Sequence, residues 1–164
     1  MAFESPFPPA VSQVGRRDWE LIEAMTYHDG DRVIVVPAGQ RTDWASVPVV
    51  LRWALDPLTG TAGALLHDHL WRVRVPAGEL TYRDADRILR EALRSLGVDR
   101  FTAWTMWASV RLGALTRPGG WRGWWRDALP ALGIMVPVSA LLAVPTVVGA
   151  PFLAAIWALK RLTR

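Results

Sequence analysis

The sequence predicts an α+β fold: a small antiparallel β-hairpin or sheet packed with about three helices, followed by a C-terminal membrane helix or helical hairpin. Stretches rich in β-branched and aromatic residues come first, helical patterns of apolar residues follow, and an uncharged run ends the chain. The 164 residues, 51% of them hydrophobic, suit one domain with an appendage. We expect an extended segment at 1–17, the α+β domain at 18–116, and an amphipathic linker with a membrane-anchoring segment at 117–164.

Composition narrows the classes of partner and site. The chain has no cysteine, which excludes disulfide frameworks and thiolate metal sites. Its net charge of +4 suits an anionic membrane surface or nucleic acid, but its arginines are scattered, so we expect no nucleic-acid partner. The N-terminus lacks the basic start and apolar stretch of a secretory signal, so the domain is expected to face the cytoplasm.

The first part of the chain is predicted to form mainly strands and loops. Residues 18–37 predict a β-hairpin, with Asp29-Gly30 as a type I′ turn and His28 as an exposed turn residue. A loop with Gly39 and Pro48 follows, and 49–55 predicts a short helix.

Three helices are predicted next. Thr61 can cap a helix over 62–72, in which His67, Asp68 and Trp71 share one face while His69 turns away towards the surface. Thr81 caps a second, amphipathic helix that ends at Gly97. Its inward positions are Ala85, Ile88, Leu89, Ala92, Leu93 and Leu96. The third helix, over 98–115, is apolar apart from an isolated Arg111.

The C-terminal region predicts attachment to the bacterial inner membrane. The 32 residues from Ala128 to Leu159 carry no charge, which exceeds the roughly 18 residues expected of a membrane span. Basic residues flank the run, and Trp121, Trp124 and Trp125 before it resemble an interfacial aromatic belt. Several prolines and the basic flanks favour a hairpin turning near 143–151. A single tilted span and a buried helical pair are the alternatives.

Carboxylates inside apolar stretches mark the candidate site. They lie in "TDWASVP" at 42–48, "LLHDHLW" at 65–71 and "RDADRIL" at 83–89. Burying an unpaired carboxylate is costly, so each needs partners. We expect an ion pair between Asp68 and Arg111, with Asp43, His67 and Asp86 gathered around it.

The order of these motifs resembles the domain-of-unknown-function family 1353 over roughly residues 18–115. The family is common in phage and prophage genomes, so the resemblance implies a phage-derived context and a small α+β domain, and it implies no mechanism. The matching residues are Thr42, Asp43, Ala45, Ser46 and Pro48, then His67, Asp68 and Leu70, then Ala85 and Asp86, and finally Val110, Arg111 and Gly113.

The residues leave several interpretations open. They can form a purely structural polar network. His67, Asp68 and Asp86 can instead bind a divalent metal ion such as Zn²⁺, Mn²⁺ or Fe²⁺, whose bound water would attack a substrate. Ser46 can act as a nucleophile, with His67 as base and Asp68 or Asp86 orienting it. A histidine–aspartate (HD) phosphohydrolase pattern would need a further upstream histidine, and only His28 is available.

Two classes of function follow from these interpretations. The first is a membrane-anchored structural or interaction module that contacts the lipid bilayer and proteins of a phage system or the cell envelope. The second is a metal-dependent hydrolase acting at the cell envelope through a His/Asp site.

Overall fold

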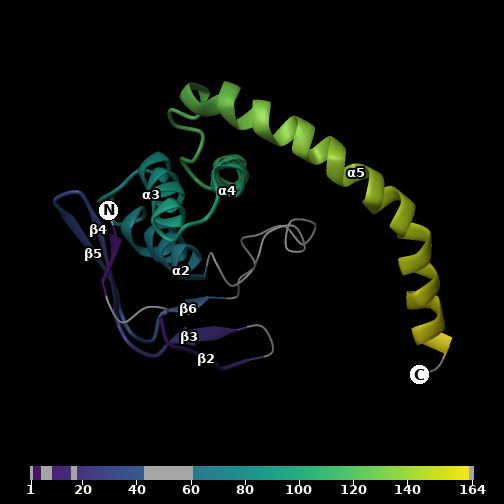
Figure 1. The fold of residues 1–164 in the computed structure, drawn as a ribbon, viewed down its shortest axis with the longest axis horizontal. Coiled ribbons are helices and arrows are strands. Elements are labelled where there is room, and N and C mark those ends of the chain that lie inside the picture. Colours follow the sequence, from purple (N-terminus) through teal and green to yellow (C-terminus); the bar gives the residue numbers. More distant parts are fainter. Residues whose placement is uncertain (1, 5–8, 16–17, 43–60, 163–164) are drawn as a thin grey trace.

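The computed structural model describes residues 2–4, 9–15, 18–42 and 61–162, with only some of the side chains beyond residue 141. It is an α+β structure in which two small antiparallel sheets lie on one side of a group of helices (Figure 1). One sheet has the order β1-β4-β5, formed by Ala2–Phe3, Met25–Asp29 and Arg32–Val36. The other has the order β2-β3-β6, formed by Val11–Gln13, Trp19–Leu21 and Arg41–Thr42. The α+β class that the sequence predicts is thus confirmed.

The strands differ from the predicted single hairpin over 18–37. The hairpin consists of β4 and β5 alone, and pairing of Asp29 with Arg32 leaves Gly30 and Asp31 as its two-residue loop. Gly30 has φ of 62°, a backbone conformation that glycine adopts without steric cost. Strand β3 pairs instead with β2 and β6, because the chain bends between Leu21 and Met25 and leaves one sheet for the other.

The three helices of the domain agree with the sequence pattern. Helix α2 (Thr61–His69) continues into η1 (Leu70–Arg74), a π-helical turn in which the Val75 N–H donates to the Leu70 carbonyl at 2.9 Å. Helix α3 (Tyr82–Ser95) begins at a reciprocal capping box formed by Thr81 and Asp84. Helix α4 (Arg100–Ala114) begins at Asp99, whose carboxylate accepts from the Thr102 N–H.

Two layers of the core lie around α3. One layer packs the sheets against α2 and α3, and the second packs α3 against α4. The inward positions predicted for α3 are buried as expected, apart from the half-buried Leu96. The first layer is formed by Leu21, Tyr27, Ile34, Val36, Leu65, Leu66, Leu70 and Ile88, among others, and the second by Leu89, Leu93, Val98 and Ala103.

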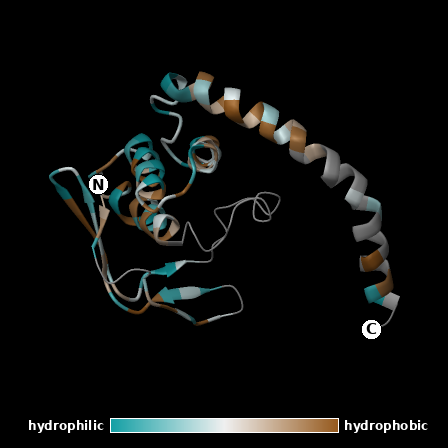
Figure 2. Ribbon diagram, viewed as in Figure 1, coloured by the Kyte–Doolittle hydropathy of each residue, from teal (hydrophilic) through white to brown (hydrophobic). Residues whose placement is uncertain are grey.

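Helix α5 (Trp125–Leu162) is continuous over 38 residues. It packs on α4 near its start and then runs away from the domain along a curved path (Figure 1). Hydrophobic residues, brown in Figure 2, recur along its first turns. The predicted hairpin near 143–151 is therefore wrong, because a proline inside a helix can kink it without ending it. Within the part of the chain that is described, no helix is both long and apolar enough to cross a membrane.

Candidate functional site

Asp86 is the centre of a buried polar cluster that joins three helices. Its carboxylate is fully buried, yet it accepts three hydrogen bonds. Oδ1 accepts from His67 Nε2 and from Trp71 Nε1, both at 2.8 Å, and Oδ2 accepts from Arg111 Nη1 at 2.9 Å. The cluster therefore supplies the partners that a buried carboxylate needs.

The positions of these residues follow from helix geometry. His67 and Trp71 are four residues apart where α2 passes into η1, so their rings lie on one side, with centroids 4.8 Å apart. Asp86 follows the buried Ala85 on α3, and Arg111 is buried near the end of α4. The α2–η1, α3 and α4 segments consequently meet at one carboxylate.

The cluster continues as a chain of alternating charges to the start of α5. Arg111 Nε lies 3.3 Å from Asp127 Oδ2, and Arg83 donates to both oxygens of Asp127 at 2.9–3.2 Å. This pairing raises the pKa of Arg83. Trp124 Nε1 adds a bond to the Arg111 carbonyl at 2.8 Å. We call Asp86, His67, Trp71, Arg111, Asp127 and Arg83 the Asp86 network.

The network orients the His67 ring. Because an oxygen of the Asp86 carboxylate must accept, Nε2 carries the hydrogen, and Nδ1 has a lone pair available. Among the described residues Nδ1 has no hydrogen-bond partner. A carboxylate that fixes the tautomer of a histidine in this way also makes its other nitrogen a better base or metal ligand.

His67 lines an open cleft between the α2–η1 segment and the end of α4. The cleft has a volume of about 750 Å³, within the range of roughly 300–1,000 Å³ that ligand pockets occupy. It combines aromatic, apolar, hydroxyl, basic and acidic groups. The described lining residues are His67, Asp68, Trp71, Arg72, Val75, Pro76, Tyr82, Ser109, Val110, Gly113, Thr116, Arg117 and Pro118.

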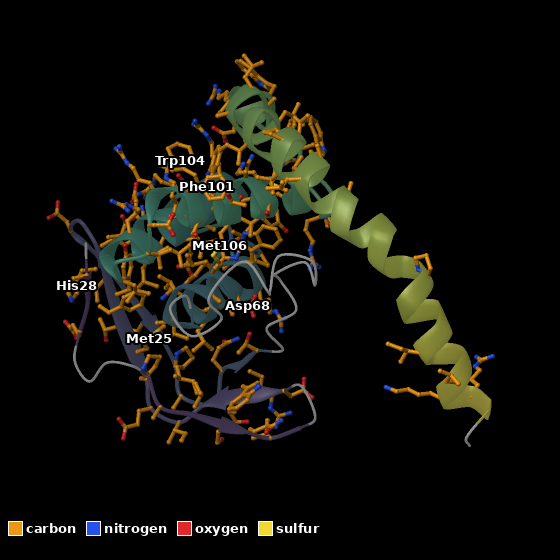
Figure 3. All side chains as sticks on the ribbon, turned by 45° about the vertical axis from the view of Figure 1, so that its right-hand side comes forward. Met25, His28, Asp68, Phe101, Trp104 and Met106 are labelled. Carbon is orange, nitrogen blue, oxygen red and sulfur yellow. The ribbon has the colours of Figure 1, made fainter. Side chains whose placement is uncertain are left out.

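Asp68 lines the same cleft but has a different partner from the predicted one. Arg111 pairs with Asp86 and Asp127, whereas Asp68 Oδ2 accepts from Thr42 Oγ1 at 2.6 Å. Asp68 thus ties α2 to strand β6, and Figure 3 places it on the side of α2 facing the β2-β3-β6 sheet. Successive helical residues point about 100° apart, so His67 and Asp68 reach different elements.

His69 is buried, contrary to its predicted surface position. Its side chain is 4% exposed, and Nδ1 lies 3.3 Å from Gln40 Oε1. Burial, with a smaller contribution from the Arg74 cation, lowers the pKa of His69. The prediction failed because the β-sheets and α3 cover different sides of α2, so that a residue turned away from His67 still meets protein.

The remaining predicted site residues separate into two groups. Asp43 and Ser46 lie outside the described residues, so the proposed roles of both stay predictions. His28 lies on β4 beside Glu4, on the far side of the domain from Asp68 (Figure 3), so it cannot complete a histidine–aspartate pattern with His67. Within the described ranges, no group of three or more histidine or acidic side chains is arranged to hold a metal ion.

Sequence reasoning missed Asp127 and its partner Arg83. The missed signal is charge scarcity, since Asp127 is the only acidic residue between 100 and 164, and it stands directly before the uncharged run. An isolated acid in such a context needs a cationic partner, and the isolated Arg111 was available for that role.

The chain also matches a known family model. The model, described as a protein of unknown function, DUF1353, matches residues 19–110. The protein belongs to the DUF1353 family. Neither a curated protein nor a solved structure matches the chain. The DUF1353 match includes His67, Trp71, Arg83 and Asp86, while Arg111 and Asp127 lie beyond it, so the Asp86 network joins the family domain to the following segment.

Proposed function

We propose that this DUF1353 protein is a membrane-anchored interaction module of a phage- or prophage-derived system. The observation that carries the proposal is the attachment of the first turn of α5 to the domain. Asp127, in the first turn of α5, is buried and held by both Arg83 and Arg111. The uncharged run therefore starts from a fixed joint with the domain and not from a loose linker.

The composition of α5 supports a lipid partner. Its 38 residues correspond to about 57 Å of helix at 1.5 Å per residue. The run from Ala128 to Leu159 is uncharged, with Arg126 before it and Lys160 after it. The proposal places the domain on the cytoplasmic side of the bacterial inner membrane, where it would contact proteins of the phage system or the envelope.

Membrane fractionation tests this proposal. Full-length protein should sediment with membranes and resist washing with salt and alkaline carbonate. A matched truncation that removes 140–164 keeps Asp127 and the turns of α5 that pack on α4, so the domain should fold but lose wash resistance. Full-length protein that is soluble and monodisperse without detergent would contradict the proposal.

A second candidate, a metal-dependent hydrolase at the envelope, is favoured by the cleft beside His67. In this alternative Asp86 is not itself a ligand, because its oxygens already accept from His67, Trp71 and Arg111. It would orient His67, whose Nδ1 would bind Zn²⁺, Mn²⁺ or Fe²⁺ together with Asp68.

Metal analysis separates the two candidates. For a hydrolase, purified protein should carry about one metal ion per chain, which His67→Ala should remove. His28→Ala is the matched control. Because His28 lies far from the cleft, this variant should retain the metal. Equal metal content in wild type and His67→Ala would eliminate the hydrolase candidate.

A further inference from the structure

The first four turns of α5 have two different apolar faces. One face packs on α4 through Ala131, Ile134 and Met135, against Trp107 and Ala108. The other carries apolar side chains at spacings of four, three and four residues, which places them in one stripe along the helix. This stripe, which we call the outward face, consists of Trp125, Leu129, Leu132 and Val136, all exposed.

The apolar residues of the outward face are strongly exposed and lie next to one another, unlike apolar residues that are scattered singly over a protein surface. Trp125 is 73% exposed and Leu129 is 86% exposed, and the exposed Trp121 lies four residues before Trp125. A contiguous exposed apolar surface with aromatic residues indicates an interaction site.

The charges around the outward face have one sign. Asp127 is the only acid between 100 and 164, and it is buried and paired with Arg83 and Arg111. The charges that α4, α5 and their connection present to solvent are therefore all positive. Arg122 and Arg126 are exposed beside the face, and the Arg126 guanidinium lies 5.4 Å from the centre of the Trp125 ring.

We propose that the outward face lies flat on an anionic bilayer, so that the first four turns of α5 act as an interfacial amphipathic helix. Tryptophan and leucine on one face with arginine beside them are typical of helices that lie in the headgroup region. The proposal rests on the membrane attachment proposed above, and it specifies the manner of contact and the class of lipid.

The packing of α5 on α4 determines from which residue onward α5 can enter the hydrocarbon of the bilayer. The side of α5 that holds Ala131, and the buried Val138 beyond it, belong to the domain core, so lipid cannot surround these turns without displacing α4. Only residues after Val138 are free to enter the hydrocarbon. The domain is thus held directly against the membrane surface.

Single cysteines test the geometry, because the natural chain has none. Leu129→Cys, Ile156→Cys and Phe101→Cys replace exposed apolar residues on the outward face, on distal α5 and at the start of α4. Each full-length variant is reconstituted into phosphatidylglycerol-containing vesicles and labelled with an environment-sensitive fluorophore. Quenching is measured with a lipid-borne nitroxide and with aqueous iodide.

The expected result is lipid quenching at positions 129 and 156, and iodide quenching at position 101. Replacing Arg122 and Arg126 by glutamate should reduce lipid quenching at 129 and leave 156 unchanged, since distal α5 does not depend on these charges.

The quenching pattern distinguishes failure of the flat orientation from failure of membrane attachment. Lipid quenching at 156 with iodide quenching at 129 would overturn the flat orientation and leave membrane attachment standing. Iodide quenching at both positions would overturn both proposals. Shielding of 129 from both quenchers, together with concentration-dependent dimerisation, would assign the outward face to a second copy of the chain and overturn the lipid assignment.

Discussion

Asp86 and Arg111 form a fully buried ion pair, with 2.9 Å between Oδ2 and Nη1 and no exposed surface on either side chain. Two charges in such a place are tolerated because each has further partners: His67 and Trp71 for Asp86, and Asp127 for Arg111. Removing one member of a buried pair leaves an uncompensated charge, which costs about 3–5 kcal/mol. We therefore expect that replacing either Asp86 or Arg111 alone destabilises the fold.

Trp71 contributes a hydrogen bond as well as ring packing. Trp71→Phe keeps an aromatic ring beside His67 but removes the Nε1–H that donates to Asp86. Loss of one bond to a charged acceptor should lower the free energy of unfolding by about 1.5–3 kcal/mol. Urea denaturation measures the change. Trp121→Phe, at an exposed tryptophan, serves as the control and should change stability by less than about 0.5 kcal/mol.

Thr42 anchors β6 to α2 through its hydroxyl. Thr42→Val preserves the shape of the side chain but removes the bond to Asp68, so we expect a loss of about 1–3 kcal/mol in unfolding free energy. Thr42→Ser retains the hydroxyl and should recover most of this difference. If the valine and serine variants were equally stable, the hydroxyl would contribute nothing and the role assigned to Thr42 would be wrong.

His69 should make stability depend on pH. Burial lowers its folded-state pKa below the unfolded value near 6.5, so the unfolded chain takes up a proton first as the pH falls. The His69 contribution is therefore fully present above about pH 6.5 and declines below it, by at most about 1.4 kcal/mol per pH unit.

Urea denaturation at pH 7.5 and 5.5 measures this dependence. His69→Gln should flatten the decline, while His28→Gln, at a half-buried strand position, should leave it as in wild type. A decline of equal size in the His69→Gln variant would show that other groups cause it.

Helix α3 illustrates what the sequence could predict. Its amphipathic spacing, the Thr81 cap and Gly97 at its end are local signals, and each has its expected place in the structure. The strands were harder, because pairing between β3 and β6 joins residues about twenty positions apart and leaves no local signature.

The sequence predicted residues that meet at the site, but it did not predict which carboxylate pairs with Arg111. His67, Asp86 and Arg111 do come together, because each is a buried polar group that needs partners. Sequence spacing alone could not decide whether Asp68 or Asp86 would face Arg111, because that depends on how α2, α3 and α4 cross. The burial of His69 likewise depends on contacts made by both sides of α2.

A double-mutant cycle on Arg111 tests the Asp86 network most directly. Stability is measured for Asp86→Asn, Arg111→Met and the double variant, and in parallel for Asp68→Asn with the same arginine change. The structure predicts a coupling energy of about 1.5–3 kcal/mol between Asp86 and Arg111, and about 0.5 kcal/mol or less between Asp68 and Arg111. Strong coupling of Arg111 to Asp68 with none to Asp86 would contradict the network.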